Sequence, residues 1–333
     1  MGLDSLKDSS RVLLIGMGGG GDVVSALALT ELIEGLQTRG RSDNARARES
    51  ATREVSEERP VSGWVLGGVA WERSPIDPRP GPRSLAEIYG GRPLGSAAVL
   101  ADADTTSSDG VHFSESRMAE HTGKPTLLLD ITGGPGATAR GISEAARELD
   151  CDAVVFVDVG GDVLAHGDEP GLASPLCDAI MLAAAAQLEP ELTAIGAVYG
   201  PGCDGELTPS EVLERIDDLG AVGALLGAWG LTPSACELVE SAAATVPTEA
   251  SLQAVRCARG ERGTATIRSG RRTVELTPLG ALTFFFDPRK AVESVAPLAH
   301  AVAPAASLEE AHDALASLGV STELELERAR SRE

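Results

Sequence analysis

A glycine-rich segment near the N-terminus joins an apolar run to a helical pattern, and this order constrains the fold more than any other feature. Residues 12–15 are Val-Leu-Leu-Ile, residues 16–21 include five glycines, and residues 23–33 have apolar side chains at helical spacing. A strand, a glycine loop and a helix in this order present backbone N–H groups and a helix N-terminus to an anion. The segment therefore predicts a ligand site at the first βα turn of an α/β domain. The predicted ligand-binding residues of this turn are Gly18, Gly19, Gly20, Gly21 and Asp22.

The same change from apolar run to turn recurs along the chain. Further apolar runs occupy residues 63–69, 97–102, 126–131, 153–159 and 193–199. The clearest helical patterns lie between them, at residues 136–149, 174–188 and 208–219. Continuous apolar runs of this length are typical of strands buried on both faces. Their alternation with helices predicts an α/β fold with a Rossmann-like, doubly wound and mostly parallel sheet.

We expect the Rossmann-like domain to span residues 1–235, with a small C-terminal α+β appendage, residues 236–333, packed on it. Within the appendage, two short runs around Ser-Gly-Arg at residues 269–271 predict a β-hairpin. Residues 39–60 are polar, charged and weakly periodic, which predicts an exposed and mobile insertion.

The acid excess of the chain excludes several classes of partner. The 333 residues include 28 Lys and Arg against 50 Asp and Glu, which gives a formal net charge of −22. Because so acidic a surface repels nucleic acid and anionic lipid, we expect neither as a partner. Adaptation of a halophile to high internal salt accounts for such a surface. The sequence is compatible with a homo-oligomer and does not decide the oligomeric state.

The sequence shows no targeting or membrane signal. No apolar run approaches the ~18 residues of a membrane span, and the N-terminal residues lack a signal-peptide pattern. The five cysteines are scattered without a CxxC pair, which argues against a disulfide framework and against a zinc site. We therefore expect a cytoplasmic protein.

The densest group of acidic residues follows the most apolar run. Asp158 ends this run, Asp162 follows across a Gly-Gly turn, and Asp178 lies in the helical pattern that begins after Ser174. Acids beside glycines either coordinate a hard cation or bind sugar hydroxyls and act as general acid or base. We predict these three aspartates as catalytic residues, and we predict that Asp158 and Asp162 bind a metal ion, Mg²⁺ or Mn²⁺. The predicted ligand-binding residues of this region are Gly160, Gly161, Glu169 and Ser174.

Other turns predict contacts to the same anionic ligand. Arg73 and Arg83 flank a proline-rich segment after residues 63–69, and their guanidinium groups bind either an anion or the chain's own carboxylates. A strand–acid–glycine turn follows Asp130 and favours anions for the same reason as the first turn. Its predicted ligand-binding residues are Thr132, Gly133 and Gly134. The segment 199–207 after the last apolar run is a further candidate.

The glycine spacing also fits a dinucleotide fingerprint in part. Gly16, Gly18 and Gly21 match G-x-G-x-x-G, but no acidic residue closes the next run at Gly68 to bind a ribose. The absence of a following Gly-Lys-Ser/Thr excludes a nucleoside triphosphate P-loop. An NAD(P)-dependent oxidoreductase is therefore the weakest of the functions considered.

The chain resembles the archaeal family called domain of unknown function 1152. The resemblance rests on residues 18–22, 68–83, 158–162, 171–178 and 285–288, and it covers nearly the whole chain. Residues 39–60 are the part that we least expect to match. The resemblance implies an archaeal, cytoplasmic origin, and it implies no activity and no catalytic residues.

The predicted turns all follow predicted strands, so they meet at one edge of the sheet. From these residues we expect an enzyme that acts on a small anionic metabolite, a sugar phosphate or nucleotide-like molecule, by hydrolysis or group transfer. The alternative is a non-catalytic ligand-binding or regulatory protein that uses the same pocket.

Overall fold

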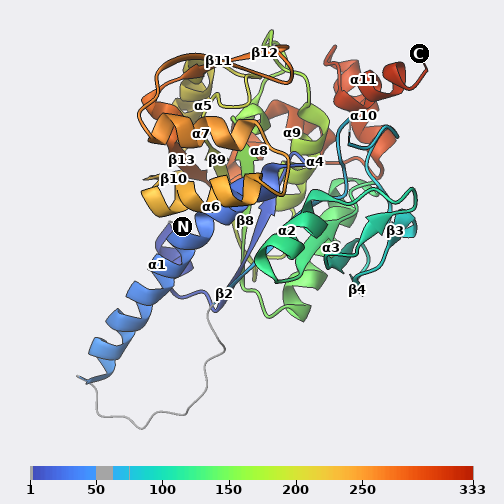
Figure 1. The fold of residues 1–333 in the computed structure, drawn as a ribbon. Helices are drawn as coiled ribbons and strands as arrows, with labels where there is room; N and C mark the ends of the chain where they lie inside the picture. Colours follow the sequence, from blue (N-terminus) through green and yellow to red (C-terminus); the bar gives the residue numbers. More distant parts are fainter. Residues whose placement is uncertain (1–2, 50–62, 75, 333) are drawn as a thin grey trace.

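The computed structural model describes residues 3–49, 63–74 and 76–332, and it gives residues 41–49 as backbone alone. A nine-stranded sheet forms the centre of the molecule (Figure 1). Its strands are β1 (Arg11–Gly16), β2 (Gly63–Val69), β4 (Arg92–Leu94), β5 (Ala98–Ala101), β7 (Thr126–Leu129), β8 (Ala153–Val159), β9 (Thr193–Tyr199), β10 (Leu225–Gly230) and β13 (Leu282–Phe286). Two small sheets pair β3 (Ile88–Tyr89) with β6 (Thr106–Ser107), and β11 (Gly263–Ile267) with β12 (Arg272–Leu276).

Eleven α-helices are found in the described part of the chain. They are α1 (Asp22–Glu49), α2 (Ser114–Thr122), α3 (Gly134–Glu148), α4 (Pro175–Ala186), α5 (Pro209–Ala221), α6 (Pro233–Ala243), α7 (Ala250–Ala258), α8 (Pro288–Ser294), α9 (Pro297–Val302), α10 (Leu308–Ser317) and α11 (Glu323–Arg330). Short 3₁₀ helices are η1 (Leu3–Lys7), η2 (Leu85–Glu87), η3 (Asp162–Leu164) and η4 (Pro278–Ala281).

Five neighbouring strands of the large sheet are parallel, in the order β7-β2-β1-β8-β9. The chain therefore moves outward from β1 to β7, and then returns to the other side of β1 with β8 and β9. This order puts the carboxyl ends of β1 and β8 side by side, with Gly16 paired to Val157. Parallel sheets bind ligands at such a point, where the strand order reverses.

Helices cover both faces of the sheet (Figure 1). In β1, Val12 and Leu14 point into the core beneath α1, α6 and α7, whereas Leu13 and Ile15 point into the opposite core beneath α3 and α4. Alternate residues of a strand face opposite sides of the sheet. All four side chains are fully buried, because helices cover both sides. The prediction of a mixed α/β protein with a large, mostly parallel sheet is confirmed.

Antiparallel strands complete the sheet on both sides. β5 and β4 follow β7, while β13 and β10 follow β9. β13 comes from the C-terminal segment 236–333, so this segment contributes a strand to the central sheet. The same segment forms the predicted hairpin as β11 and β12. The division into two domains at residue 235 stays a prediction.

Helix α1 is longer than the sequence pattern indicates. It spans 28 residues and ends at Glu49, so residues 39–49 continue the helix that begins after the glycine loop. The remainder of the predicted mobile insertion, residues 50–60, lies outside the described residues. Neither α1 nor any other described helix is both long and apolar enough to cross a membrane.

The packing of β8 predicts a large cost for removing its aromatic side chain. Phe156 is fully buried two residues before Asp158. Phe156→Ala is expected to lower the free energy of unfolding by about 3–5 kcal/mol, because transfer and cavity terms add. Urea unfolding measures this change. Leu213→Ala, at a side chain that is 41% exposed, is the control and should stay within about 0.5 kcal/mol of the unsubstituted protein.

Candidate functional site

A pocket of about 300 Å³ opens at the carboxyl ends of β1 and β8. Seven segments of the chain line it. They are the glycine loop (18–22), the segment after β2 (72–74 and 76), the end of β8 with η3, the start of α4, the segment after β9 (204 and 206), the residues at the start of α7 (247–250), and the β11–β12 hairpin. The pocket therefore lies where the strand order reverses.

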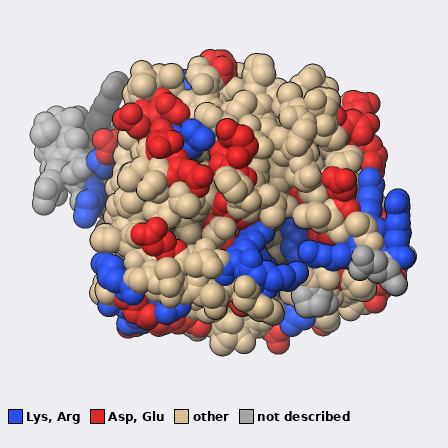
Figure 2. Space-filling view, turned by 90° about the horizontal axis from the view of Figure 1, so that it is seen from above, with Lys and Arg blue, Asp and Glu red and all other residues tan. Residues whose placement is uncertain are grey.

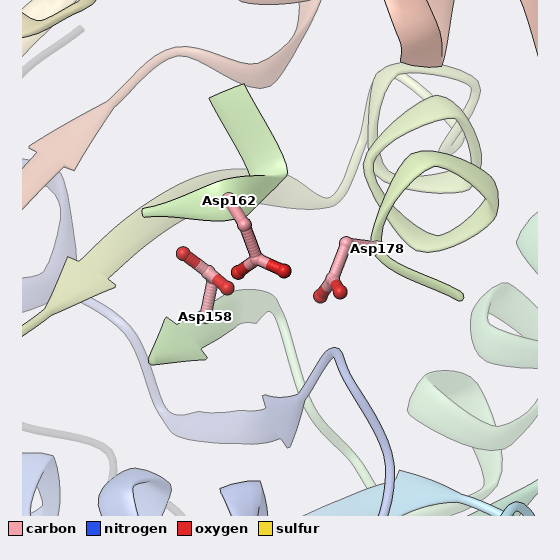
Figure 3. Close-up of side chains that lie close together, drawn as sticks. All are labelled: Asp158, Asp162 and Asp178. Atoms are coloured by element: carbon pink, nitrogen blue, oxygen red, sulfur yellow. The ribbon is translucent and has the colours of Figure 1, made fainter. Parts of the chain in front are cut away.

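Three aspartates meet on the inner wall of this pocket. Asp158 lies near the end of β8, Asp162 begins η3 and Asp178 lies in the first turn of α4, and their side chains point toward one another (Figure 3). Carboxylate oxygens of the three residues lie within 4.8 Å of one another. All three residues are buried. Asp158 Oδ2 and Asp178 Oδ1 have no hydrogen-bond partner among the described residues.

Local backbone geometry brings these aspartates together. Gly160 and Gly161 have φ values of 112° and 110°, which only glycine adopts without strain, and they turn the chain from β8 back into η3. A Cβ on Gly160 would clash with Asp204 Oδ1, so this glycine also admits a fourth carboxylate. Pro175 at the start of α4 fixes the helix and sets Asp178 in its first turn.

Burial changes the ionisation of the aspartates. Burial, together with the nearby Asp22 carboxylate, raises the pKa of Asp158 to about 8. Burial and neighbouring carboxylates also hold the pKa values of Asp162 and Asp178 well above their usual range. The protein without a cation therefore keeps protons on this cluster near neutral pH. A divalent cation binds carboxylates and displaces such protons, so its binding is linked to pH.

A second group of acidic residues also includes Asp162. Carboxylate oxygens of Asp162, Asp204 and Glu206 lie within 4.8 Å of one another, and all three residues are buried. Glu206 accepts hydrogen bonds from the N–H groups of Ala173 and Ser174 and from the Ser174 hydroxyl. The sequence marked the segment after β9 as a candidate but did not single out Asp204 or Glu206.

The glycine loop presents a carboxylate to the pocket. Asp22 Oδ2 accepts a hydrogen bond from the Gly18 N–H at 2.9 Å, so an acidic side chain already occupies this backbone donor. Burial raises the pKa of Asp22 to about 6. All four loop glycines line the pocket with Asp22. Their contact with a ligand stays a prediction.

Arg73 lines the pocket but is bound by the chain itself. Its guanidinium donates to the Gly18 carbonyl at 2.8 Å and pairs with Glu323 at 3.3 Å and Glu327 at 3.6 Å. It also lies over the Trp71 ring, 4.1 Å from the ring centroid. These contacts connect α11 to the pocket wall. The sequence left two roles open for Arg73, and the structure shows pairing with carboxylates of the chain at the edge of the pocket.

Arg83 does not line the pocket. It is 2% exposed, its Nη2 lies 2.5 Å from Asp77 Oδ2, and it donates to the carbonyl groups of Arg79 and Gly81. The sequence left two roles open for Arg83, and the structure shows the pairing with a carboxylate of the chain. This ion pair shapes the segment between β2 and η2.

Other predicted ligand-binding residues lie apart from the pocket lining. Thr132 donates to Asp130, Gly134 packs against the backbone near Ala305, and Gly133 precedes α3. Glu169 accepts hydrogen bonds from the His166 and Gly167 N–H groups and pairs with Arg215. Gly160 and Gly161 shape the turn after β8. Ser174 does line the pocket.

Three arginines of the β11–β12 hairpin line the pocket mouth, and the sequence did not predict this. Arg268, Arg271 and Arg272 belong to the lining, and Figure 2 shows Lys and Arg side chains gathered beside a hollow on this face. Arg268 and Ser269 have φ near +55°, which folds the hairpin tip tightly, and Arg268 N–H donates to Glu249. The local sequence predicts the hairpin and contains its arginines. It does not show that the hairpin lies at the mouth of the pocket.

A buried glutamate pair extends inward from the pocket. Glu72 lines the pocket and accepts from the Ser114 N–H, while both carboxylate oxygens of Glu115 in α2 lack a partner among the described residues. A Cβ on Gly68 would clash with Glu115, so the glycine in β2 makes room for this side chain. Burial and the Glu72 carboxylate raise the pKa of Glu115. Nothing in the sequence distinguishes this glutamate from surface residues of a helix.

Fold and site together define an α/β protein whose mostly parallel sheet carries a buried carboxylate cluster beneath an arginine-lined mouth. The chain belongs to the family described as "Protein of unknown function (DUF1152)", whose family model matches residues 49–331. No curated protein and no solved structure gives a significant match. The resemblance noted from the sequence is confirmed for the family. Residues 18–22, on which it rested in part, lie outside the matched residues, and the archaeal origin stays a prediction.

The buried Arg83–Asp77 pair predicts that Arg83 is structural. Arg83→Met is expected to lower the free energy of unfolding by about 3–5 kcal/mol, because it leaves the Asp77 carboxylate buried and unpaired. Urea unfolding at pH 7 measures the change. The matched control is Arg92→Met, whose partner Glu148 is exposed, and it should cost less than about 1 kcal/mol. Equal costs for the two variants would contradict the structural role.

The raised pKa of Asp158 predicts an unusual pH dependence of stability. The folded protein binds a proton that the unfolded chain releases, so without divalent cations the free energy of unfolding should fall as pH rises from 6 to 8. One such proton contributes at most about 1.4 kcal/mol per pH unit. Urea unfolding in EDTA measures the slope, and Asp158→Asn should flatten it. A wild-type stability that rises through this window would refute the prediction.

Proposed function

We propose that the protein is an enzyme that acts on a small anionic metabolite, a sugar phosphate or nucleotide-like molecule, by hydrolysis or group transfer. One observation carries the proposal: the buried carboxylates of Asp158, Asp162 and Asp178 converge at the base of a pocket whose mouth is lined by arginines. Oxygen ligands of this kind suit Mg²⁺ or Mn²⁺. Such a cation polarises a phosphoryl oxygen and lowers the pKa of bound water.

The chain's own residues divide the remaining work. Arg268, Arg271 and Arg272 at the mouth provide guanidinium groups whose geometry matches phosphate oxygens. Asp22, with its pKa raised by burial to about 6, is suited to accept or donate a proton near neutral pH. The loop glycines 18–21 belong to one wall of the pocket, and the absence of a side chain at Gly19 and Gly21 lets Trp71 and Thr248 pack closely against that wall.

The fold supports the location of this site. We infer a Rossmann-like, doubly wound topology from the order of the five parallel strands. When these strands are numbered by their place in the chain, their order across the sheet is third, second, first, fourth and fifth. The pocket lies where that order reverses. We also propose a cytoplasmic location and a halophilic archaeal source, which the net charge of −22 supports.

The electrostatics disfavour the NAD(P)-dependent alternative. A dinucleotide pyrophosphate would need the N-terminus of α1, where Asp22 already accepts from the Gly18 N–H. Asp158 and Asp178 lie in the same pocket, where they supply no positive charge to an unaccompanied anion and repel it in their ionised form. A divalent cation removes this conflict, which is why the proposal pairs the anion with a metal ion.

Substitution of Asp162 tests the proposal. We expect Asp162→Asn to weaken Mn²⁺ binding at least 100-fold in titration calorimetry, since Asp162 belongs to both acidic groups. The control is Asp217→Asn, which removes an exposed charge of α5 and should leave Mn²⁺ affinity unchanged. Unchanged binding in Asp162→Asn would overturn the metal site.

Turnover separates an enzyme from a binding protein. The wild-type protein with Mg²⁺ or Mn²⁺ is expected to release phosphate, or to transfer it, from at least one member of a panel of sugar phosphates and nucleotides. Asp162→Asn should abolish that activity. Cation-dependent binding of panel members without any turnover would instead favour the non-catalytic alternative.

A further inference from the structure

We propose that the pocket holds two divalent cations side by side, the second between Asp162 and Asp204. The inference rests on the proposed function, because Asp162 is the residue that the two positions share. The first position lies among Asp158, Asp162 and Asp178, and the second lies among Asp162, Asp204 and Glu206. A carboxylate has two oxygens, so one aspartate can contact both cations.

Asp204 carries the argument for the second position. The residue is 5% exposed, and its Oδ1 is buried without a hydrogen-bond partner in the described structure. Its Oδ2 accepts from the Glu206 N–H at 3.2 Å. Burial of a carboxylate oxygen without a partner is unfavourable, and a cation at this oxygen offsets that cost. Gly160 makes room for this carboxylate, because any side chain there would displace Oδ1.

Arg272 distinguishes Glu206 from Asp204. Arg272 Nη1 lies 2.7 Å from Glu206 Oε1 but 4.0 Å from Asp204 Oδ2. Glu206 also accepts from the N–H groups of Ala173 and Ser174. Glu206 is therefore already paired, and its role is to hold Arg272 beside the second position. Asp162 and Asp204 are the ligands that remain for a cation.

The charges of the pocket favour bound cations. Eight carboxyl groups and four arginines belong to its lining, and one of these arginines, Arg73, already pairs with Glu323 and Glu327 outside the lining. The eight are Asp22, Glu72, Asp158, Asp162, Asp178, Asp204, Glu206 and Glu249. A pair of cations about 3.5–4 Å apart stabilises both the attacking and the leaving oxygen of a phosphoryl group. Phosphate esters and anhydrides are therefore the substrate class that this centre fits.

Mn²⁺ alone is the probe for this centre. The full-length protein is freed of metal with EDTA and titrated with Mn²⁺ at pH 7.5 in 0.15 M KCl, while electron paramagnetic resonance counts free and bound ions. We expect two tightly bound Mn²⁺ per wild-type chain and a spin-coupled signal as the second ion binds. Asp204→Asn should bind one ion without that signal. The control variant Asp217→Asn should behave as the wild type does.

Each outcome bears on a different statement. One uncoupled Mn²⁺ per wild-type chain overturns the second cation and leaves the proposed function standing. Absence of tight Mn²⁺ binding overturns both. Two coupled ions in Asp204→Asn overturn the assignment to Asp204. Thermal unfolding verifies that each variant is folded, and the coupled signal of the wild type decides the number of cations independently of any variant.

Discussion

The burial of like charges at the junction of β1 and β8 is the constraint on which the pocket depends. Asp158, Asp162 and Asp178 cannot all be ionised at close range in a protein interior unless a cation is bound. Without a cation, protons must neutralise some of these carboxylates. The surrounding fold holds them there regardless, through a glycine turn, a proline-initiated helix and a fully buried strand. Holding these like charges together costs stability and raises the pKa values of the three aspartates.

Much of the fold follows from local sequence. The residue runs that became β1, β2, β7, β8 and β9 are apolar on both faces, and all except that of β2 are followed directly by glycine or acid. This pattern predicts parallel strands covered by helices, as observed. The place of β13 could not be predicted, because pairing of a C-terminal strand with β9 depends on contacts between segments that are distant in the chain.

The aspartates of the candidate site could be predicted from the sequence more readily than its arginines. Asp158, Asp162 and Asp178 stand out because acids rarely follow so apolar a run, and the structure brings them together. Arginines do not stand out in this way, since any surface contains them. Arg83 is bound to Asp77, while Arg268, Arg271 and Arg272 reach the pocket through a hairpin whose position depends on tertiary packing.

Helix α11 has a consequence for the order in which the pocket assembles. Its Glu323 accepts from the Leu176 and Cys177 N–H groups at the start of α4 and pairs with Arg73, so it joins two walls of the pocket. The ribosome makes these walls long before it makes α11. During synthesis the sheet can form before Glu323 connects Arg73 to the start of α4. The pocket therefore reaches its final geometry only after the last described helix has left the ribosome.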